Sequence, residues 1–383
     1  MQNIGLLLPR APYYESIAFD MNAGFKAGIK HFNNNDIRLV TDNIGFGTDK
    51  QQVYRAAEKM LMDDDTGIIF AYCGMRTAQL LRPLFNSANR LLVVLDSGAS
   101  LPQEWPVSPN ILYVSLHNSL GARLASKRAT LDGINTGGMV TDYYDAGYLH
   151  TLALTNGFTE NGGVISFNHA TAYRREEFTM EPLLGHIEKN PDSCLLNLFS
   201  GDYAEWYFAD MKKYFGDNVP PVYMAPFMLE ENMLARSLYA GTKNKGVAAW
   251  AKQLDNAQNK SFIQLLDQAG REANLFSLLG WEAATISNTA TRLWAQNVRH
   301  GMDTGEAIKA ETFETPRGTM KFHQATNTSL SPMYEASLED NGQGNNKLVV
   351  TGIINDTLAD YEKMIIPELG ETVSGWFNSY TCN

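Results

Sequence analysis

Short apolar segments alternate with amphipathic ones along the first 115 residues of the chain. Between the apolar runs, hydrophobic residues recur at spacings of three and four, which is the periodicity of a helix with one buried face. Near-continuous apolar strands separated by helices predict a parallel sheet covered on both faces. The predicted strands are 4–8, 37–40, 67–72 and 91–96, and the predicted helices are Ser16–Phe32, Lys50–Met62 and Thr77–Ala88.

A second alternation of the same kind follows the first. Two successive series of about 110 residues each predict two doubly wound, Rossmann-like α/β lobes of similar size. The second series has predicted strands at 137–142, 162–167, 194–199 and 222–225, and predicted helices at Leu120–Leu131, Gly147–Thr155, Arg175–Glu188 and Tyr203–Phe215.

The last part of the chain is less regular. It contains a predicted strand at 246–250, a long helix over Asn274–Val298, and a strand-like segment at 318–323. A hairpin follows, in which the turn-forming sequence NGQGNN joins strands 333–340 and 347–354. Because this hairpin comes after two finished series, it fits a chain that crosses between two lobes more than once.

Composition is that of a soluble globular protein. The 383 residues are 44% hydrophobic and 19% charged, and this length favours two domains. The formal net charge of −11 and the absence of a basic stripe argue against a nucleic-acid partner. No apolar run approaches the ~20 residues that a membrane-spanning helix needs.

The compartment is left open by the residues themselves. No secretory signal precedes the strand at 4–8, so the sequence fits either a cytosolic protein or a chain whose leader has been replaced by Met1. Three widely spaced cysteines (Cys73, Cys194 and Cys382) form no CxxC pair and have no histidines at ligand spacing. This pattern does not favour a disulfide framework or a zinc site.

Enzyme motifs are missing from the places where the fold would hold them. The first strand-to-helix turn reads LLLPRAPYYES and lacks the glycines of a dinucleotide or P-loop motif. The sequence also lacks a nucleophile elbow and an HExxH motif. Asp142 and Asp145 could act as an acid–base pair, but carboxylates that end a strand more often cap a helix. No catalytic residue, cofactor or metal is therefore predicted.

Polar and aromatic residues follow the ends of the predicted strands. Ligands of doubly wound sheets bind outside the carboxyl ends of the strands, so these residues are the candidate ligand contacts. Backbone N–H groups at Gly74 and at 99–100 favour an anionic or carbonyl group, and two arginines could fork a carboxylate. The candidates of the first lobe are Arg10, Tyr14, Tyr72, Gly74, Met75, Arg76, Ser97, Ala99 and Ser100, and those of the second lobe are Tyr143, Tyr144, Asp145, Asp202, Tyr203 and Phe227.

The tyrosines have a simpler alternative explanation, because half-buried tyrosines are common on lobe surfaces. Their concentration at predicted strand ends favours the ligand site, since aromatic walls with a few fixed polar groups are typical of small-molecule sites. The six tyrosines concerned are Tyr13, Tyr14, Tyr72, Tyr143, Tyr144 and Tyr203.

The order of these features resembles one family over nearly the whole chain. The opening IGLLLP…Y…AFDMNAGFKAGIKHFN and the segment TGIIFAYCGMRTAQLLRPLFNSANRLLVVLDSGASLPQ resemble the leucine/isoleucine/valine-binding protein group of type I periplasmic binding proteins. VTDYYDAG, SGDYAEWYFADMKK and ETPRGTMKFH are similar to its later segments. The resemblance implies two α/β lobes joined by three hinge crossovers, near 114–119, 244–251 and 326–333. Lobe 1 would comprise 1–115 and 250–327, and lobe 2 would comprise 119–245 and 333–383.

The resemblance also implies which residues hold the ligand. The family's carboxylate anchors fall on Gly74, Ala99 and Ser100, although many members have serine where this chain has Gly74. The acidic residue that holds an amino group in amino-acid binders corresponds to Phe227, and the loop tyrosine of that lobe falls near Ala146. These departures favour an acid, an amide or an aromatic compound over a branched-chain amino acid.

The sequence therefore predicts the substrate-binding component of an ABC-type importer. Its two lobes would close around a small polar molecule that bears a carboxylate or an amide. Its partners would be that ligand and a membrane permease, and its location periplasmic or extracellular, with the leader absent from this chain. The alternatives are a sensing receptor of the same fold that feeds a signalling partner, and an α/β enzyme of unrecognised type that uses Asp145 or Arg76 in an open cleft.

Overall fold

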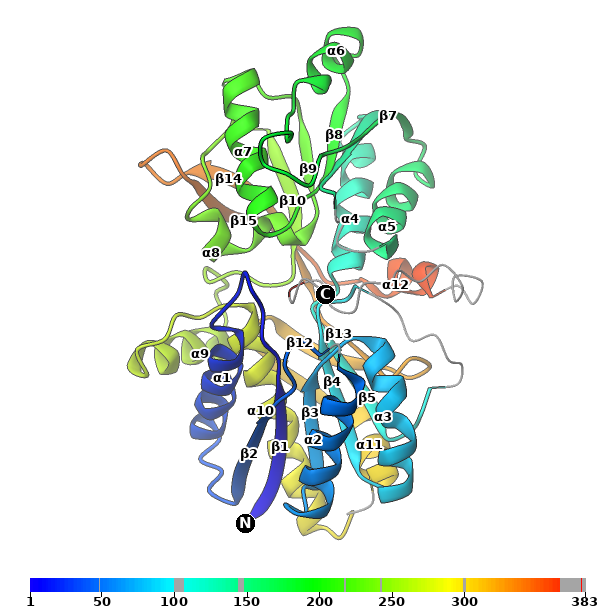
Figure 1. Ribbon diagram of the computed structural model, residues 1–383, viewed down its shortest axis with the longest axis vertical. Helices are drawn as coiled ribbons and strands as arrows, with labels where there is room; N and C mark the ends of the chain where they lie inside the picture. The colour runs from blue at the N-terminus through cyan, green and yellow to red at the C-terminus, as the bar shows by residue number, and fades with distance from the viewer. Residues whose placement is uncertain are drawn as a thin grey trace. The chain divides into compact units, whose positions relative to one another are not determined.

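Contacts divide the chain into two compact units, each with its own β-sheet (Figure 1). The computed structural model describes residues 1–47, 49–99, 107–143, 148–216, 218–241, 243–298, 301–365 and 380. Unit 1 comprises Met1–Leu116, Leu254–Ser331 and Tyr380, and unit 2 comprises His117–Gln253 and residues 332–365. The lobe boundaries and hinge crossings given above stay predictions.

The sheet of unit 1 has eight strands in the order β11-β12-β13-β5-β4-β3-β1-β2. The run β2-β1-β3-β4-β5 is parallel, and the antiparallel pairs β11–β12 and β12–β13 extend it at one side. Every residue of β3, β4 and β5 is buried, which explains why their sequences are continuously apolar. The strands are β1 (Gln2–Leu8), β2 (Ile37–Asn43), β3 (Ile68–Tyr72), β4 (Leu91–Asp96), β5 (Ile111–Ser115), β11 (Thr312–Thr315), β12 (Gly318–His323) and β13 (Thr328–Leu330).

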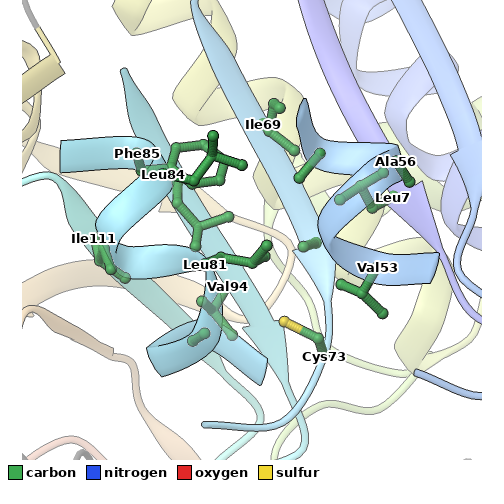
Figure 2. Close-up of a cluster of buried hydrophobic side chains, with 14 of the residues drawn as sticks. Leu7, Val53, Ala56, Ile69, Cys73, Leu81, Leu84, Phe85, Val94 and Ile111 are labelled. Carbon is green, nitrogen blue, oxygen red and sulfur yellow. The ribbon is translucent and has the colours of Figure 1, made fainter. Parts of the chain in front are cut away.

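Helices cover both faces of this sheet. Figure 2 shows one core cluster, in which side chains of β1, β3 and β4 meet those of α2 and α3; Cys73 belongs to this cluster. The helices of unit 1 are α1 (Ile17–His31), α2 (Lys50–Met62), α3 (Met75–Ala88), α9 (Ala257–Gln268), α10 (Leu275–Ala295) and α11 (Gly301–Lys309).

Glycines let α1 and α10 approach each other closely. A Cβ atom added at Gly24 would lie 1.9 Å from the carbonyl oxygen of Ser277, and one added at Gly280 would lie 2.0 Å from that of Met21. Both obstacles are backbone atoms, which cannot rotate out of the way. The small residues that the sequence repeats in α1 are therefore a packing requirement of this helix pair.

A buried ion pair joins α10 to the turn between β11 and β12. The guanidinium of Arg317 donates to both carboxylate oxygens of Glu282 at 2.7 and 2.8 Å, and also to the carbonyl oxygen of Ser115 at 2.9 Å. Both charged side chains are almost fully buried. The fork geometry thus links the late β-segment to the end of β5.

The sheet of unit 2 has seven strands in the order β15-β14-β10-β9-β8-β6-β7. Its run β7-β6-β8-β9-β10 is parallel and has the same doubly wound order as β2-β1-β3-β4-β5 in unit 1. The late hairpin pairs antiparallel to β10. The strands are β6 (Thr136–Thr141), β7 (Val164–Ala170), β8 (Cys194–Leu198), β9 (Val222–Met224), β10 (Asn244–Ala248), β14 (Met333–Asp340) and β15 (Asn346–Ile354).

The helices of unit 2 include a second glycine contact and a second buried arginine. A Cβ at Gly157 of α5 would lie 2.2 Å from the carbonyl oxygen of Arg123 in α4. The Arg123 guanidinium donates to Asp360 at 3.0 Å and to Glu160 at 2.6 Å. The helices are α4 (Asn118–Leu131), α5 (Tyr148–Thr159), α6 (Pro182–Lys189), α7 (Gly201–Phe215), the 3₁₀ helix η1 (Pro226–Leu229), α8 (Glu231–Leu234) and α12 (Leu358–Met364).

Most elements predicted from the sequence are present, and one is substantially wrong. The helix predicted over Arg175–Glu188 begins only at Pro182, because proline is favoured in the first helical turn. The preceding residues form turns instead, where Arg175 pairs with Asp210 at 3.2 Å. In the described part of the chain, no helix combines the length and apolar character needed to cross a membrane. Among the elements of the described residues, eight were not predicted at all: β5, β11, β13, α8, α9, α11, α12 and η1.

Candidate functional site

Each sheet has one point where the strand order reverses, and such points are where ligands of doubly wound folds bind. In unit 1 the reversal lies between β1 and β3, and in unit 2 between β6 and β8. The segments that follow these strands hold most of the predicted site residues. Each edge is therefore a candidate site, and each is described within its own unit.

The segment after β1 is held by the segment after β2. The Ile44 N–H donates to the carbonyl oxygen of Leu8 at 3.0 Å, and the Arg10 N–H donates to that of Gly45 at 2.7 Å. These bonds place Arg10 at the carboxyl edge with its side chain exposed. Tyr14 follows, half-buried, and leads into α1.

The segment after β3 turns directly into α3. Gly74 is the N-cap residue, in extended conformation, and it supplies no side chain to bond the first turn of the helix. The Thr77 N–H donates to the Gly74 carbonyl oxygen at 3.0 Å, whereas the N–H groups of the first two helical residues have no partner inside the helix, so a glycine cap leaves these two open to an anion. Met75 is buried at this position. The Arg76 side chain lies outside the described part of the structure.

The segment after β4 is shaped by Asp96. The Gly98 N–H donates to Asp96 Oδ1 at 2.7 Å, and Gly98 has φ +80°, a conformation that favours glycine. Burial raises the pKa of Asp96 to about 6, against opposing contributions from the Ser115 hydroxyl, the Gly98 N–H and the Arg317 charge. This turn brings the half-buried Ala99 to the edge, next to the buried Ser97. Ser100, the remaining predicted anchor, lies outside the described residues.

An aromatic cluster lies beside these segments in unit 1. The ring centroids of Tyr14 and Phe276 are 5.1 Å apart, and Tyr380 contacts both rings edge-on at 5.3 Å. Tyr72, the last residue of β3, contacts Phe276 at 6.2 Å. These four side chains, called the aromatic cluster below, bring together two predicted site residues (Tyr14 and Tyr72) and two that the sequence did not single out.

The Tyr72 hydroxyl is the exceptional polar group of this cluster. Tyr72 is 1% exposed, and its hydroxyl oxygen has no hydrogen-bond partner among the described residues. Burial raises the pKa of Tyr72 far above its ordinary value, and nearby Tyr380 and Asp96 raise it further. Burying a hydroxyl without a hydrogen-bond partner costs free energy, and a bound group that donates to it or accepts from it would remove this cost.

At the edge of unit 2, the polar groups bond to one another. Both the N–H and the hydroxyl of Ser200, the N-cap residue of α7, donate to Asp142 Oδ2, at 2.8 and 3.3 Å. The Asp142 N–H in turn donates to the carbonyl oxygen of Leu198 at 3.0 Å. Asp142 thus fixes the N-cap residue of α7 without itself capping a helix. Tyr144 and Asp145 lie outside the described residues.

Tyrosines also gather at this edge. Tyr143 is 61% exposed, and its ring lies 5.7 Å from that of Tyr173, which is 59% exposed and was not predicted. The Tyr203 hydroxyl donates to the carbonyl oxygen of Tyr173 at 2.9 Å. Tyr173 therefore links the two predicted tyrosines. It lies three residues beyond the last residue of β7, close enough for the strand-end rule that selected Tyr143 to apply.

The two remaining predicted residues of unit 2 have different surroundings. Asp202 lies near the start of α7 with much of its side chain exposed. Partial desolvation of its carboxylate and the charge of Glu205 raise its pKa, and the charge of Arg236 opposes them. Phe227 lies in η1, is 2% exposed and packs against the His150 ring at 4.8 Å. Phe227 is therefore a buried side chain of unit 2.

No group of three His, Cys, Asp or Glu side chains within the described ranges is arranged to hold a metal ion. The described thiols, Cys73 and Cys194, are both buried and free of disulfides. What the geometry offers instead is non-covalent binding, with N–H donors, aromatic rings and one buried hydroxyl at the edge of unit 1.

Comparison with known proteins gives the fold and the family. The chain is similar to an ABC transporter substrate-binding protein from Sphaerobacter thermophilus, with 17% identity, a TM-score of 0.79, and coverage of 93% of this chain and 98% of the other. It is also similar to two Rhodopseudomonas palustris solute-binding proteins of ABC transporters. The one from strain HaA2, in complex with p-hydroxybenzoic acid, has 15% identity, a TM-score of 0.77 and coverage of 94% and 98%. The one from strain BisB5, in complex with 3,4-dihydroxybenzoic acid, has 16% identity, a TM-score of 0.75 and coverage of 92% and 97%.

A search of curated protein sequences returned no match. The similarity to the three solved solute-binding proteins confirms the predicted fold of two doubly wound α/β lobes. The model of a family described as "Periplasmic binding protein" matches residues 2–343 and confirms the prediction of a binding protein. The chain therefore belongs to the periplasmic binding protein family.

Proposed function

We propose that this protein is the solute-binding receptor of an ABC importer and that its ligand is a small aromatic carboxylate. The family supports a receptor, and the two Rhodopseudomonas palustris neighbours are described as solute-binding proteins holding hydroxylated benzoic acids. Neither the sensing receptor nor the enzyme considered above gains support from these comparisons. The proposal extends the sequence prediction of an acid, an amide or an aromatic compound.

One observation carries the choice of ligand. At the carboxyl end of β3, an anion-accepting helix start at Gly74 and a buried aromatic side chain, Tyr72, are two residues apart in the chain. A carboxylate bound to the open N–H groups of α3 would place an attached ring toward aromatic side chains. Arg10, exposed at the same edge, adds a positive charge that attracts an anion.

The remaining predicted contacts belong to the proposal as well. Ala99 and Ser100 would add a backbone N–H and a hydroxyl for the carboxylate, with Ser97, Met75 and Arg76 beside them. From unit 2, the proposed contacts are Tyr143, Tyr144, Asp145, Asp202, Tyr203 and Phe227. Phe227 stands where amino-acid binders have an acidic residue, which favours a ligand that has no ammonium group.

The proposed partner is the membrane permease of the importer, and the proposed site of action is the periplasm. The family name places its members there. We further propose that the protein is made with an N-terminal leader sequence that directs its export and is then removed. Expression of the native gene followed by cell fractionation would locate the protein, and a cytosolic pool alone would contradict this part of the proposal.

The proposal is tested by identifying the ligand. Small molecules released from the purified protein are identified by mass spectrometry, and binding of benzoate, p-hydroxybenzoate and leucine is measured by calorimetry. An aromatic acid should bind and should raise the melting temperature without being consumed. Turnover of the bound compound would contradict a receptor, and binding of leucine alone would contradict the aromatic acid.

A pair of substitutions at Gly74 tests the anion-binding helix start. In Gly74→Asp the new carboxylate accepts from the first-turn N–H groups itself and repels an anion, so affinity should fall at least about tenfold while the helix is, if anything, stabilised. Gly74→Ser is the matched control, because it caps the helix without adding charge and should retain binding. Equal affinities of the two variants would remove the α3 start from the site.

A further inference from the structure

Tyr380 is an aromatic side chain that comes from far along the chain and is buried at the proposed ligand-binding edge. It is 2% exposed and lies beyond α12 in the sequence, yet it belongs to unit 1. Its ring contacts Tyr14, from the segment after β1, and Phe276, at the start of α10, each at 5.3 Å. Tyr14 and Phe276 also contact each other, so the three rings pack pairwise edge to face.

This position is incompletely satisfied when Tyr380 fills it. Tyr380 lies near enough to Tyr72 to raise the pKa of the Tyr72 hydroxyl electrostatically. The Tyr72 hydroxyl nevertheless has no hydrogen-bond partner among the described residues, although Tyr72 is 1% exposed. The ring of Tyr380 therefore packs well against the neighbouring aromatic rings, but its hydroxyl does not form a hydrogen bond with the buried Tyr72 hydroxyl.

We propose that Tyr380 occupies a subsite for the aromatic ring of the ligand and that the ligand displaces it. The inference rests on the proposed function and adds an internal competitor to it. An aromatic acid makes the same edge-to-face contacts with Tyr14 and Phe276 as Tyr380 does. In addition, its polar substituent accepts a hydrogen bond from the Tyr72 hydroxyl. The substituent therefore gives the ligand an interaction that Tyr380 lacks.

A competitor inside the chain lowers the apparent affinity in proportion to the time it occupies the subsite. If the subsite is open for a fraction of the time, the apparent dissociation constant is the intrinsic one divided by that fraction. Tyr380 would thus set a threshold concentration for loading the receptor. It would also exclude ligands that cannot replace its two ring contacts.

Calorimetry with p-hydroxybenzoate on the full chain tests this competition. Tyr380→Ala should bind at least about tenfold more tightly than the wild type, as expected for a subsite that is open a tenth of the time. Tyr380→Phe, the matched variant, retains the competing ring and should remain as weak as the wild type. Phe19→Ala, at an exposed position of α1, controls for the loss of any aromatic side chain. Unchanged or weaker binding by Tyr380→Ala would overturn the proposal.

A second measurement uses the wild-type chain and does not depend on a variant that folds. Chymotrypsin cleaves after tyrosine, so the rate of cleavage after Tyr380, followed by mass spectrometry, reports how often this side chain leaves its position. Saturating p-hydroxybenzoate should accelerate that cleavage while protecting the rest of the chain. Slower or unchanged cleavage after Tyr380 in the loaded protein would contradict displacement.

The failure of this inference is distinguishable from the failure of the proposed function. If the wild type binds an aromatic acid and Tyr380→Ala gains nothing, the receptor stands and the competitor is wrong. If neither the wild type nor Tyr380→Ala binds any aromatic acid, but a different solute is recovered from the purified protein, the ring subsite is wrong and a receptor for another ligand remains. Binding by Tyr380→Ala where the wild type shows none would support the competitor most strongly.

Discussion

The carboxyl edges of the two sheets share a strand order but differ in how their polar groups are satisfied. In unit 2, Asp142 accepts two hydrogen bonds from Ser200, and the Tyr203 hydroxyl donates to a backbone carbonyl. In unit 1, the helix start at Gly74 has no side-chain cap and the Tyr72 hydroxyl has no partner among the described residues. The buried Thr171 hydroxyl of unit 2 also has no partner among the described residues, so the difference between the edges lies in the capped helix start and the bonded tyrosine of unit 2. An incomplete edge is what a ligand can complete.

The units differ in the same way in their buried arginines. The Arg317 guanidinium of unit 1 forks Glu282, which is fully buried, and its charge also acts on the buried Asp96. Arg123 of unit 2 has two carboxylates, and one of them, Glu160, is 39% exposed. Both acidic groups near Arg317 are therefore buried, whereas one of the two carboxylates that hold Arg123 is partly exposed.

The largest predicted effect comes from removing one partner of each arginine. Glu282→Gln leaves the buried Arg317 charge without the carboxylate that it forks, so the free energy of unfolding should fall by about 3–5 kcal/mol. Glu160→Gln leaves Asp360 in place and removes a partly exposed partner, so it should cost about 1 kcal/mol or less. Urea unfolding of both variants measures the difference. Equal losses would show that the two arginines are held alike.

The pH dependence of stability should have opposite signs in the two units. The pKa of Asp96 is about 6 in the folded chain against an ordinary 3.8, so the folded state binds this proton more tightly than the unfolded state. Stability should therefore fall as pH rises from about 4 to about 6, by about 3 kcal/mol at most. Asp96→Asn should flatten this part of the profile.

In unit 2, Asp132 behaves in the opposite way. Burial alone would raise its pKa, but hydrogen bonds from Lys245, Tyr223 and Arg128 outweigh burial and lower it to about 2. Its contribution is present above an ordinary pKa of 3.8 and is lost as pH falls from about 4 toward 2. Asp132→Asn should abolish that loss, as followed by the urea midpoint at several pH values. Loss of the same pH window in both variants would contradict the assignment of one carboxyl to each window.

The smallest predicted effect separates the two tyrosine hydroxyls. Tyr203→Phe removes a hydrogen bond to the Tyr173 carbonyl and should cost about 1 kcal/mol of stability. Tyr72→Phe removes a buried hydroxyl that has no partner, so stability should stay equal or rise slightly. Affinity for an aromatic acid should instead fall about tenfold in Tyr72→Phe, since the proposed bond to the ligand is lost. Melting curves with and without p-hydroxybenzoate measure both quantities, and a destabilised Tyr72→Phe that binds normally would reverse the assignment.

Sequence patterns predicted the strands of the parallel runs well, with one omission. Strands such as β3 and β4 lie between covering helices, so their apolar runs are continuous and easily recognised. β5 was missed although it is equally apolar, and β13, its neighbour in the sheet, has only three residues and comes from far along the chain. α9 was missed although Asn256 caps it by accepting from the Asn259 N–H, a signal that was present in the sequence.

The candidate site was predictable only where it follows a strand. Tyr14 and Tyr72 were found because they lie at strand ends, and Tyr173 obeys the same rule but was overlooked. Phe276 starts a predicted helix, and nothing in its local pattern indicates contact with Tyr14. Tyr380 gives no signal at all, because its place depends on a long-range contact that periodicity does not encode.

Burial of Cys73 and Cys194 determines how these thiols would react in an oxidising compartment. Burial raises the pKa of both Cys73 and Cys194 to about 12, to which the charge of Asp96 contributes at Cys73. Only the thiolate attacks disulfides and oxidants, and at neutral pH about one such thiol in 10⁵ is ionised. A periplasmic protein meets enzymes that form disulfides. The core that stabilises each unit therefore also keeps Cys73 and Cys194 unreactive, so neither of these two thiols needs a disulfide partner in an oxidising compartment.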